Sequence, residues 1–363
     1  MNYIFTFGRD RDLSLLEVYN FLKANYKFKV VELAKKLAIF QIENFNPQKA
    51  ISRLGGVVKI AKVLANGVDA VEKEISKIDV ENKRINYSIS TYNSKIGDFV
   101  RECLKQHFKE LKVKAMLKRA RTPSQIIKKK IFPQGLDFIV YKEMLAKTEA
   151  LFNPEEHIAR DIERPRKDYL KTISIRLAKI LINLASIKPG SLMLDPFCGY
   201  GTILQEALLM GINCIGLDVN KSSINAASTN LKWLKKNYKF NANYKLIVGN
   251  ARKLSNFVKE KVDAIVTEPY LGPFIRGRLT PKKQESYSKK LIPLYREFLT
   301  EAAKVLKKNA KIIVILPEFV GSKPIPFNKF SICKFPKISV NPPIKYGTKQ
   351  KLIRNVFVLV RKQ

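Results

Sequence analysis

The chain has 363 residues, with 68 lysines and arginines against 31 acidic residues and a formal net charge of +37 at pH 7. This excess favours a polyanionic partner such as nucleic acid, because each phosphate neutralised by Lys or Arg releases condensed counterions. A lysine-rich genome is the alternative explanation. No apolar run approaches the roughly 18 to 20 residues that span a bilayer, so we expect no membrane segment.

Cysteine and histidine usage narrows the chemistry further. The N-terminus, MNYIFTFGRDRD, lacks the basic and apolar regions of a secretory signal. The only histidines, His107 and His157, give little support to histidine-based catalysis. The cysteines are far apart and form no CxxC pair, which predicts a reducing cytoplasm and neither a disulfide framework nor a metal site. They are Cys103, Cys198, Cys214 and Cys333.

Residues 1–60 predict an α+β domain of ferredoxin-like type. Tyr3 to Phe7 and Leu37 to Ile42 have the composition of strands, and Ser14 to Ala24 has helical spacing of apolar residues. A second helix is expected to begin at Pro47 and to close before Gly55 and Gly56.

Residues 61–150 repeat this alternation with more charge. Tyr87 to Tyr92 alternates as a strand, and Gly97 to Leu111 is an amphipathic helix. Ile126 to Lys130 and Phe138 to Tyr141 are interpreted as later strands. Residues 151–172, with Pro165 inside a charged run, predict a linker to a further domain.

A basic loop precedes and adjoins a run of lysines in the second of these regions. A loop of this kind is usually a solvated face, but the adjoining lysines favour contact with phosphates. The residues concerned are Lys118, Arg119, Arg121, Lys128, Lys129 and Lys130.

Residues 173–363 predict an α/β domain with a doubly wound, Rossmann-like sheet. A helix over Ile173 to Ala185 is followed by apolar strands that alternate with helices. The expected strands are Leu192 to Leu194, Cys214 to Leu217, Lys245 to Val248, Ala264 to Val266 and Lys311 to Leu316.

The segment DPFCGYG, Asp195 to Gly201, follows the first of these strands and precedes a helix over Thr202 to Leu209. Gly199 and Gly201 allow a sharp turn and a close approach to a ligand. An acid at the strand end would repel a pyrophosphate, whereas it can pair with a cationic amino group such as that of S-adenosylmethionine. A tight turn in an unrelated α/β protein is the alternative.

Two further strand ends carry polar residues. Asp218 lies 23 residues after Asp195 and can hydrogen-bond both ribose hydroxyls of a nucleoside, or it can cap the helix that begins near Lys221. Asn250 could hydrogen-bond an adenine edge, and Ala251 leaves room for the ring.

The fourth strand ends in Thr267-Glu268-Pro269-Tyr270-Leu271-Gly272. An exocyclic base amine is a poor nucleophile, and acceptors such as the Glu268 carboxylate and the Pro269 carbonyl can help it attack a methyl group. Tyr270 could stack an extruded base. A plain strand exit broken by proline and glycine is the alternative.

Taken with DPFCGYGT, these features resemble the THUMP-domain tRNA guanosine N2-methyltransferases of archaeal type, which modify position 10 of tRNA. The resemblance covers nearly the whole chain, including Arg164-Pro165 and the helix that ends at Ala185. It implies that the methionine part of the cofactor is cradled by Asp195, Phe197, Gly199, Gly201 and Thr202. It also implies that Asp218 holds the ribose with Val219 beside the adenine, and that Asn250 stands where the family often has Asp.

The catalytic loop departs from the family pattern, which is Asp or Asn, Pro, Pro, then Tyr or Phe. Here Glu268 takes the acid position, Pro269 the first proline, and Tyr270 replaces the second proline. We expect an enzyme that transfers a methyl group from S-adenosylmethionine to the N2 amine of a guanosine in tRNA. The alternatives are a DNA adenine-N6 or cytosine-N4 methyltransferase, and a non-catalytic RNA-binding protein. We expect a monomer and leave a helper subunit open.

Overall fold

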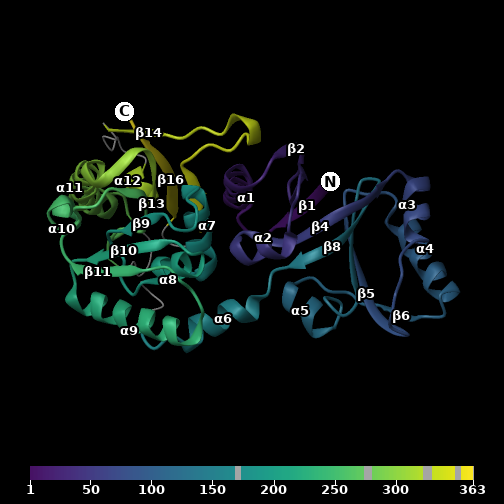
Figure 1. The fold of residues 1–363 in the computed structure, drawn as a ribbon. Helices are drawn as coiled ribbons and strands as arrows, with labels where there is room; N and C mark the ends of the chain where they lie inside the picture. The colour runs from purple at the N-terminus through teal and green to yellow at the C-terminus, as the bar shows by residue number, and fades with distance from the viewer. Residues whose placement is uncertain (168–172, 274–279, 322–328, 348–352, 363) are drawn as a thin grey trace. The chain divides into compact units, whose positions relative to one another are not determined.

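The computed structural model describes residues 1–167, 173–273, 280–321, 329–347 and 353–362 (Figure 1). Its contacts divide the chain into two units. The N-terminal unit comprises Met1–Arg11, Tyr26–Arg53 and Val57–Ala159, and the C-terminal unit comprises Asp12–Asn25, Leu54–Gly56 and Arg160–Gln363. No helix in the described ranges is long and apolar enough to cross a membrane.

The N-terminal unit is built on one eight-stranded sheet of order β2-β3-β1-β4-β8-β7-β5-β6. Its strands are β1 (Asn2–Phe7), β2 (Phe28–Leu33), β3 (Leu37–Ile42), β4 (Val57–Asn66), β5 (Arg84–Tyr92), β6 (Lys114–Leu117), β7 (Leu136–Tyr141) and β8 (Met144–Leu151). Its helices are α2 (Pro47–Arg53), α3 (Val68–Ile75), α4 (Gly97–Glu110), α5 (Pro123–Lys128) and α6 (Pro154–Glu163), the last of which leads into the C-terminal unit.

Strand β4 runs across the predicted boundary at residue 60 and pairs with β1 on one side and β8 on the other. A buried ion pair reinforces this continuity, because Lys59 Nζ on β4 lies 2.7 Å from Asp137 Oδ2 on β7. Thr148 on β8 donates to the same carboxylate at 2.6 Å. The predicted ferredoxin-like and THUMP parts therefore share one sheet, and their separation into two domains stays a prediction.

The prediction of a strand over Ile126 to Lys130 is wrong, because this segment lies in and just after helix α5. Thr122 caps the helix by accepting from the Gln125 amide, and Pro123 occupies its first turn. Ile126 is buried in this helix. In so short an element, the spacing of apolar residues does not distinguish a helix from a strand. The predicted linker likewise contains most of α6, and its residues 168–172 lie outside the described ranges.

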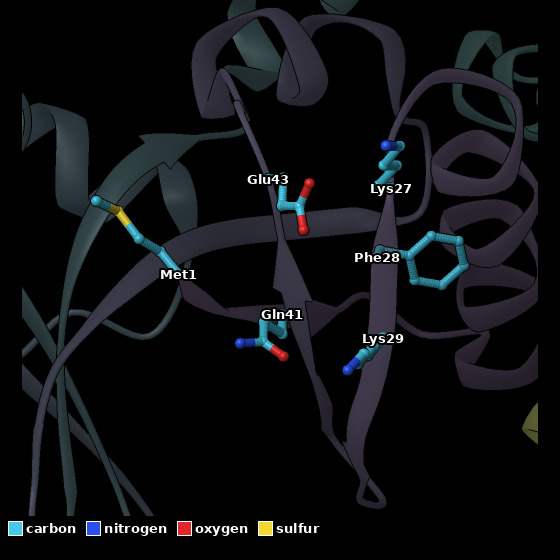
Figure 2. A pocket seen from close by; sticks show the side chains of 6 residues that line it. All are labelled: Met1, Lys27, Phe28, Lys29, Gln41 and Glu43. Atoms are coloured by element: carbon cyan, nitrogen blue, oxygen red, sulfur yellow. The ribbon is translucent and has the colours of Figure 1, made fainter.

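A hollow of about 360 Å³ opens on the outer part of this sheet. Figure 2 shows its lining, which comes from β2, β3 and the residues beside them: Met1, Lys27, Phe28, Lys29, Gln41 and Glu43. None of these residues belongs to the chemistry-bearing motifs of the sequence.

The C-terminal unit contains the predicted doubly wound sheet, of order β11-β10-β9-β12-β13-β16-β14, with β15 paired to β16. The strands from β11 to β13 are parallel, and β16 is antiparallel to β13. The strands are β9 (Leu192–Asp195), β10 (Asn213–Asp218), β11 (Tyr244–Val248), β12 (Val262–Thr267), β13 (Leu306–Pro317), β14 (Phe330–Ile332), β15 (Ile344–Tyr346) and β16 (Arg354–Arg361). The predicted fold class, a Rossmann-like domain preceded by α+β structure, is confirmed.

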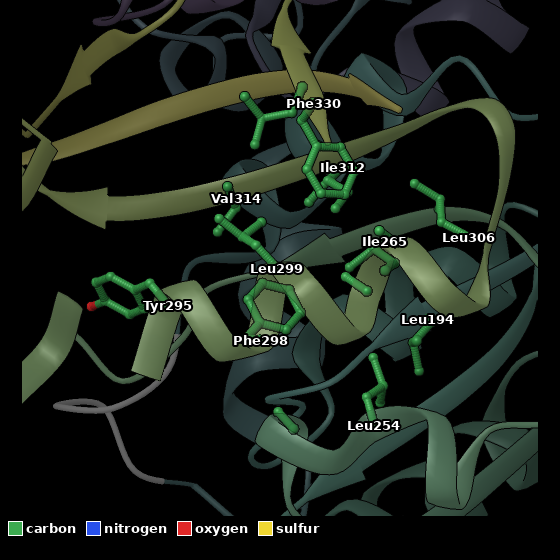
Figure 3. Packing of buried hydrophobic residues seen from close by; sticks show 14 of the residues in the cluster. Leu194, Leu254, Ile265, Tyr295, Phe298, Leu299, Leu306, Ile312, Val314 and Phe330 are labelled. Atoms are coloured by element: carbon green, nitrogen blue, oxygen red, sulfur yellow. The ribbon is translucent and has the colours of Figure 1, made fainter. Parts of the chain in front are cut away.

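Helices cover both faces of this sheet, with α10 and α11 on one side and α7 and α8 on the other (Figure 1). Figure 3 shows how Phe298 and Leu299 of α11 pack toward Ile265 and Val314 of the central strands. The helices of the unit are α1 (Arg11–Asn25), α7 (Ile175–Ala185), α8 (Thr202–Leu209), α9 (Lys221–Asn237), α10 (Leu254–Phe257), α11 (Pro281–Val305) and α12 (Glu318–Gly321), with short 3-10 turns η1 (Ala251–Lys253) and η2 (Pro336–Ile338).

Helix α1 belongs to the C-terminal unit although it lies between two strands of the other unit in sequence. The buried Glu17 carboxylate accepts from the Gly55 and Gly56 amides at 2.7 Å and from Asn183 Nδ2 of α7 at 2.8 Å. Lys311 Nζ on β13 donates to Asn20 Oδ1 at 3.1 Å, and burial lowers the pKa of Lys311 to about 8. Buried polar side chains therefore anchor α1, and each has a partner, as burial demands.

We predict that Glu17→Gln lowers the free energy of unfolding of the C-terminal unit by roughly 2 to 4 kcal/mol, because one amide oxygen cannot replace two carboxylate oxygens that accept three buried hydrogen bonds. Trp233, the single tryptophan, lies in this unit on α9, so its fluorescence during urea unfolding reports the change. Glu81→Gln on the exposed turn before β5 is the control. Equal stability of the two variants would contradict the anchoring role.

Candidate cofactor and catalytic site

The chemistry-bearing residues of the sequence meet at the carboxyl edge of the C-terminal sheet. Asp195 ends β9, Asp218 ends β10, and Thr267 ends β12, and these strands are parallel. The strand order reverses at β9, because β10 lies on one side of it and β12 on the other. Open α/β sheets bind their ligands outside such a reversal point.

The turn from Pro196 to Gly201, called here the glycine turn, links β9 to α8. Gly199 and Gly201 have φ values of 50° and 83°, in the left-handed region that favours glycine. A Cβ built on Gly199 meets no atom within 4 Å, so the space in front of the turn is open and a side chain would fill it. Thr202 begins α8 directly after the turn, as the sequence predicts.

Asp195 is buried at the base of this turn. Its Oδ1 accepts from Thr267 Oγ1 at 2.6 Å and from the Phe197 amide at 3.2 Å. The pKa of Asp195 is raised to about 7, chiefly by burial; the two hydrogen bonds oppose this rise, and the nearby charges of Asp218 and Glu268 add to it. A neighbouring cation would favour the ionised form.

Asp218 faces the glycine turn from the end of β10. Its Oδ2 accepts from the Gly199 amide at 3.0 Å and its Oδ1 from the Asn220 amide at 2.9 Å. The N-cap residue of α9 is Asn220. The alternative prediction, that Asp218 caps this helix, is therefore wrong. Each carboxylate oxygen keeps a second acceptor site, and Val219 beside it is 64% exposed.

Phe197, Asn250 and Ala251 complete the predicted cofactor set. The Phe197 ring packs edge-on against Phe298 with centroids 5.3 Å apart. Asn250 is exposed after β11, and its side-chain oxygen accepts from the Arg252 amide at 2.9 Å, which caps the short η1 turn. Ala251 is buried.

The catalytic loop contains an ion pair that the sequence did not indicate. Arg354 Nε on β16 donates to Glu268 Oε1 at 2.9 Å, and the Glu268 side chain is only 13% exposed. Burial raises the pKa of Glu268, and Arg354 opposes the rise. Tyr270 is 58% exposed, and its carbonyl accepts from Tyr295 Oη at 2.7 Å, which fixes the backbone while leaving the ring accessible.

Three residues that contact the site were not predicted from the sequence to do so: Thr267, Tyr295 and Arg354. Thr267 stands next to Glu268 and could have been suspected as the last residue of a buried strand. Tyr295 and Arg354 are 25 and 86 residues from their partners, and no local pattern marks them. Burial also raises the pKa of the Cys198 thiol in the glycine turn, which argues against a thiolate nucleophile there.

The predicted RNA-contacting residues lie together in the N-terminal unit, on the β6–α5 loop, at the last residue of α5 and directly after it. Lys129 Nζ donates to the Arg119 carbonyl at 2.6 Å, which joins the two basic runs. Lys118 is partly buried, and the other five side chains are exposed. None of the six forms an ion pair with an acidic side chain of the described ranges, so their charge is uncompensated there.

Comparison with known proteins finds a family match within the C-terminal unit. Residues 164–320 match the RMKL-like methyltransferase domain family. The full chain also superposes on the crystal structure of TrmN from Thermus thermophilus with a TM-score of 0.55, 15% identity and coverage of 99% of this chain and 100% of that one. The superposition shows that the fold is Rossmann-like, and the family match lies in the C-terminal unit, which contains the strand-end site.

Sequence relatives narrow the class. The tRNA (guanine(10)-N2)-dimethyltransferase of Methanothermobacter thermautotrophicus is 33% identical over 195 residues, 54% of this chain and 52% of that protein. Its counterpart from Methanocaldococcus jannaschii is 33% identical over 150 residues, 39% of this chain and 37% of that protein. The matched stretches span about half or less of these relatives. These relatives are named tRNA (guanine(10)-N2)-dimethyltransferases, and the motifs of this chain resemble the tRNA guanosine N2-methyltransferase family.

We predict that Asp195 makes stability depend on pH. Its folded pKa of about 7 exceeds the ordinary value of 3.8, so between these values the native state binds more protons than the unfolded state and stability falls as pH rises. The stability of the wild type minus that of Asp195→Asn should therefore decrease from pH 5 to pH 8. Urea unfolding followed by Trp233 fluorescence measures this difference. If the stabilities of the two proteins changed in parallel with pH, a raised pKa of Asp195 would be contradicted.

Proposed function

We propose that this chain transfers a methyl group from S-adenosylmethionine to the exocyclic N2 amine of a guanosine in tRNA, with position 10 as the first candidate. The single observation that carries the proposal is the meeting of Asp195, the glycine turn and Asp218 beside Glu268 at one edge of the sheet. The names of the relatives support the choice of base and of RNA.

The residues at this edge fit S-adenosylmethionine. Asp195 Oδ2 accepts no hydrogen bond from the described residues and can pair with the ammonium of the methionine part. The open space in front of Gly199 admits a ligand against the backbone. Asp218 has acceptor capacity left for ribose hydroxyls, with the exposed Val219 beside the place of the adenine. The buried Ala251 and the exposed Asn250 follow the next strand.

Asp195, the glycine turn and Asp218 would hold S-adenosylmethionine, which would supply an electrophilic methyl group for the guanine N2. The nitrogen–carbon bond would form as the sulfur–carbon bond breaks, S-adenosylhomocysteine would leave, and the amine would lose one proton to the Glu268 carboxylate. The Glu268 carboxylate and the Pro269 carbonyl accept hydrogen bonds from the two N2 protons and favour rehybridisation of the amine. Arg354 holds Glu268 Oε1, so Oε2 is the oxygen presented to the amine. The exposed Tyr270 ring stacks the extruded base. Most of the rate enhancement comes from positioning and electrostatics.

The Glu–Arg pair bears on the departure of this loop from the family pattern. Glutamate is one methylene longer than the aspartate of the family pattern. Its additional rotatable bond would make the orientation of the carboxylate less well defined. Arg354 removes that freedom by fixing one oxygen of the carboxylate, because a charge-assisted hydrogen bond at 2.9 Å is short and directional. The altered loop is therefore compatible with catalysis rather than with a degenerate domain.

We predict that Glu268→Gln lowers kcat for tRNA methylation by roughly 100-fold or more, because removing one preorganised acceptor costs about that much. Calorimetry should find its affinity for S-adenosylmethionine within about 2-fold of the wild type. Glu260→Gln, on the exposed turn before β12, is the matched control. Mass spectrometry of nucleosides from the methylated tRNA identifies the base. Absence of S-adenosylmethionine binding by the wild type would contradict the proposal.

We predict that replacing Lys118, Arg119 and Arg121 by Ala weakens tRNA binding and flattens its dependence on salt by up to about three counterions, because these side chains would contact phosphates. Filter binding from 50 to 200 mM salt measures both effects. The control variant replaces Lys73, Lys77 and Lys83, three exposed lysines of the same unit, and removes the same charge. An equal salt slope in the two triple variants would mean that the basic loop is merely solvated.

A further inference from the structure

Residues that have no role in the proposed function form hydrogen bonds to the glycine turn and to the first residue of α8. Asn230 on α9 is completely buried, and its Nδ2 donates to the Tyr200 carbonyl at 3.0 Å. The same side-chain amide brackets the backbone of Arg166, because its Oδ1 accepts from the Arg166 amide at 2.9 Å and its Nδ2 donates to the Arg166 carbonyl at 3.0 Å. One side chain thus ties the turn to a segment 34 residues earlier in the chain.

A second contact comes from the same early segment. Arg164 is 99% buried, and its Nη1 donates to Thr202 Oγ1 at 2.8 Å, at the first residue of α8. Arg160, one turn earlier on α6, forms a buried ion pair with Glu206 of α8 at 3.1 and 3.2 Å. The stretch from Arg160 to Arg166, part of the predicted linker, therefore packs against the turn and its helix.

These contacts lie on either side of one of the two left-handed glycines of the turn. The Tyr200 carbonyl and the Thr202 hydroxyl lie on either side of Gly201, which has a φ of 83°. On the ligand side, the Gly199 amide is already held by Asp218. Glycine loses more conformational entropy on ordering than any other residue, so a turn with two left-handed glycines is costly to fix.

We propose that Arg164 and Asn230 are positioning residues that order the glycine turn before the cofactor arrives. This inference rests on the proposed function, in that S-adenosylmethionine is the ligand of the turn. A preordered turn spares the ligand the cost of ordering it, and affinity rises accordingly. The Arg164 guanidinium is buried against the turn, and its Nη2 lies 3.3 Å from Asp161 Oδ1. Loss of its partners would leave an uncompensated buried charge, which favours a fixed arrangement.

The first experiment compares Asn230→Ala with Asn237→Ala, a control on the same helix whose side chain only donates to the Trp233 carbonyl. Amide hydrogen exchange in the ligand-free protein should speed up roughly 10-fold at Gly199 and Gly201 in Asn230→Ala and stay unchanged in the control. Calorimetry with S-adenosylhomocysteine should give a roughly 10-fold weaker Kd, the effect expected of one lost buried hydrogen bond. Unchanged exchange and an unchanged Kd, with only a lower Tm, would overturn the proposal.

The second experiment tests the hydrogen bond between Arg164 and Thr202. Its result does not depend on whether Asn230→Ala folds. Thr202→Val removes the acceptor hydroxyl at nearly constant volume, and Thr202→Ser restores it. If Arg164 acts through that hydroxyl, Arg164→Gln and Thr202→Val each weaken S-adenosylhomocysteine binding, and the double variant is no weaker than the worse single one. Fully additive losses would overturn the proposal. A wild type that binds no S-adenosylhomocysteine would refute the proposed function, while the exchange data would still decide whether Arg164 and Asn230 order the turn.

Discussion

The hydrogen bond from Thr267 Oγ1 to Asp195 Oδ1, 2.6 Å long, joins the ends of β12 and β9 at the centre of the C-terminal sheet. A carboxylate in so buried a place is expensive to ionise, and it persists there because donors surround one of its oxygens. This bond fixes the starting points of two loops, the glycine turn after β9 and the Glu268 loop after β12. The cofactor and the acceptor base are proposed to meet between them, so an error in the placement of Asp195 would displace both halves of the reaction.

The sequence was sufficient to predict the turn after β9 and the acids at the neighbouring strand ends, because these signals are local. A buried strand, an acid at its end and two glycines before a helix occupy 18 consecutive residues, Leu192 to Leu209, and predict a turn that only glycine can make. The apolar runs of β10, β12 and β13 were also recognisable, since parallel strands buried on both faces are continuously apolar. The edge strand β11 is only partly buried. Asp218 followed from its place after the second run. Each of these inferences needed no knowledge of what lies across the fold.

The features that the sequence did not reveal depend on contacts between residues far apart in the chain. Arg354 resembles any basic residue of a basic chain until β16 inserts beside β13 and brings it to Glu268. Arg164 and Arg160 stand in a charged, proline-containing run, the usual composition of a solvated linker, and only the packed structure shows them buried. Helix α5 was mistaken for a strand because a six-residue element has too few apolar positions to separate the two periodicities.

The docking of α1 on the C-terminal unit also sets an order of events during synthesis. Residues Leu13 to Leu22 of this helix are buried without interruption, yet Glu17 must wait for Asn183, and Asn20 is 291 residues ahead of Lys311. At about 5 to 20 residues per second, the ribosome needs roughly 15 to 60 s to make that stretch. During this interval the apolar face of the helix has no finished surface to pack on and is exposed to solvent. The nascent chain is therefore at its most vulnerable to aggregation early, and a molecular chaperone that shields its first 25 residues would act where the need is greatest.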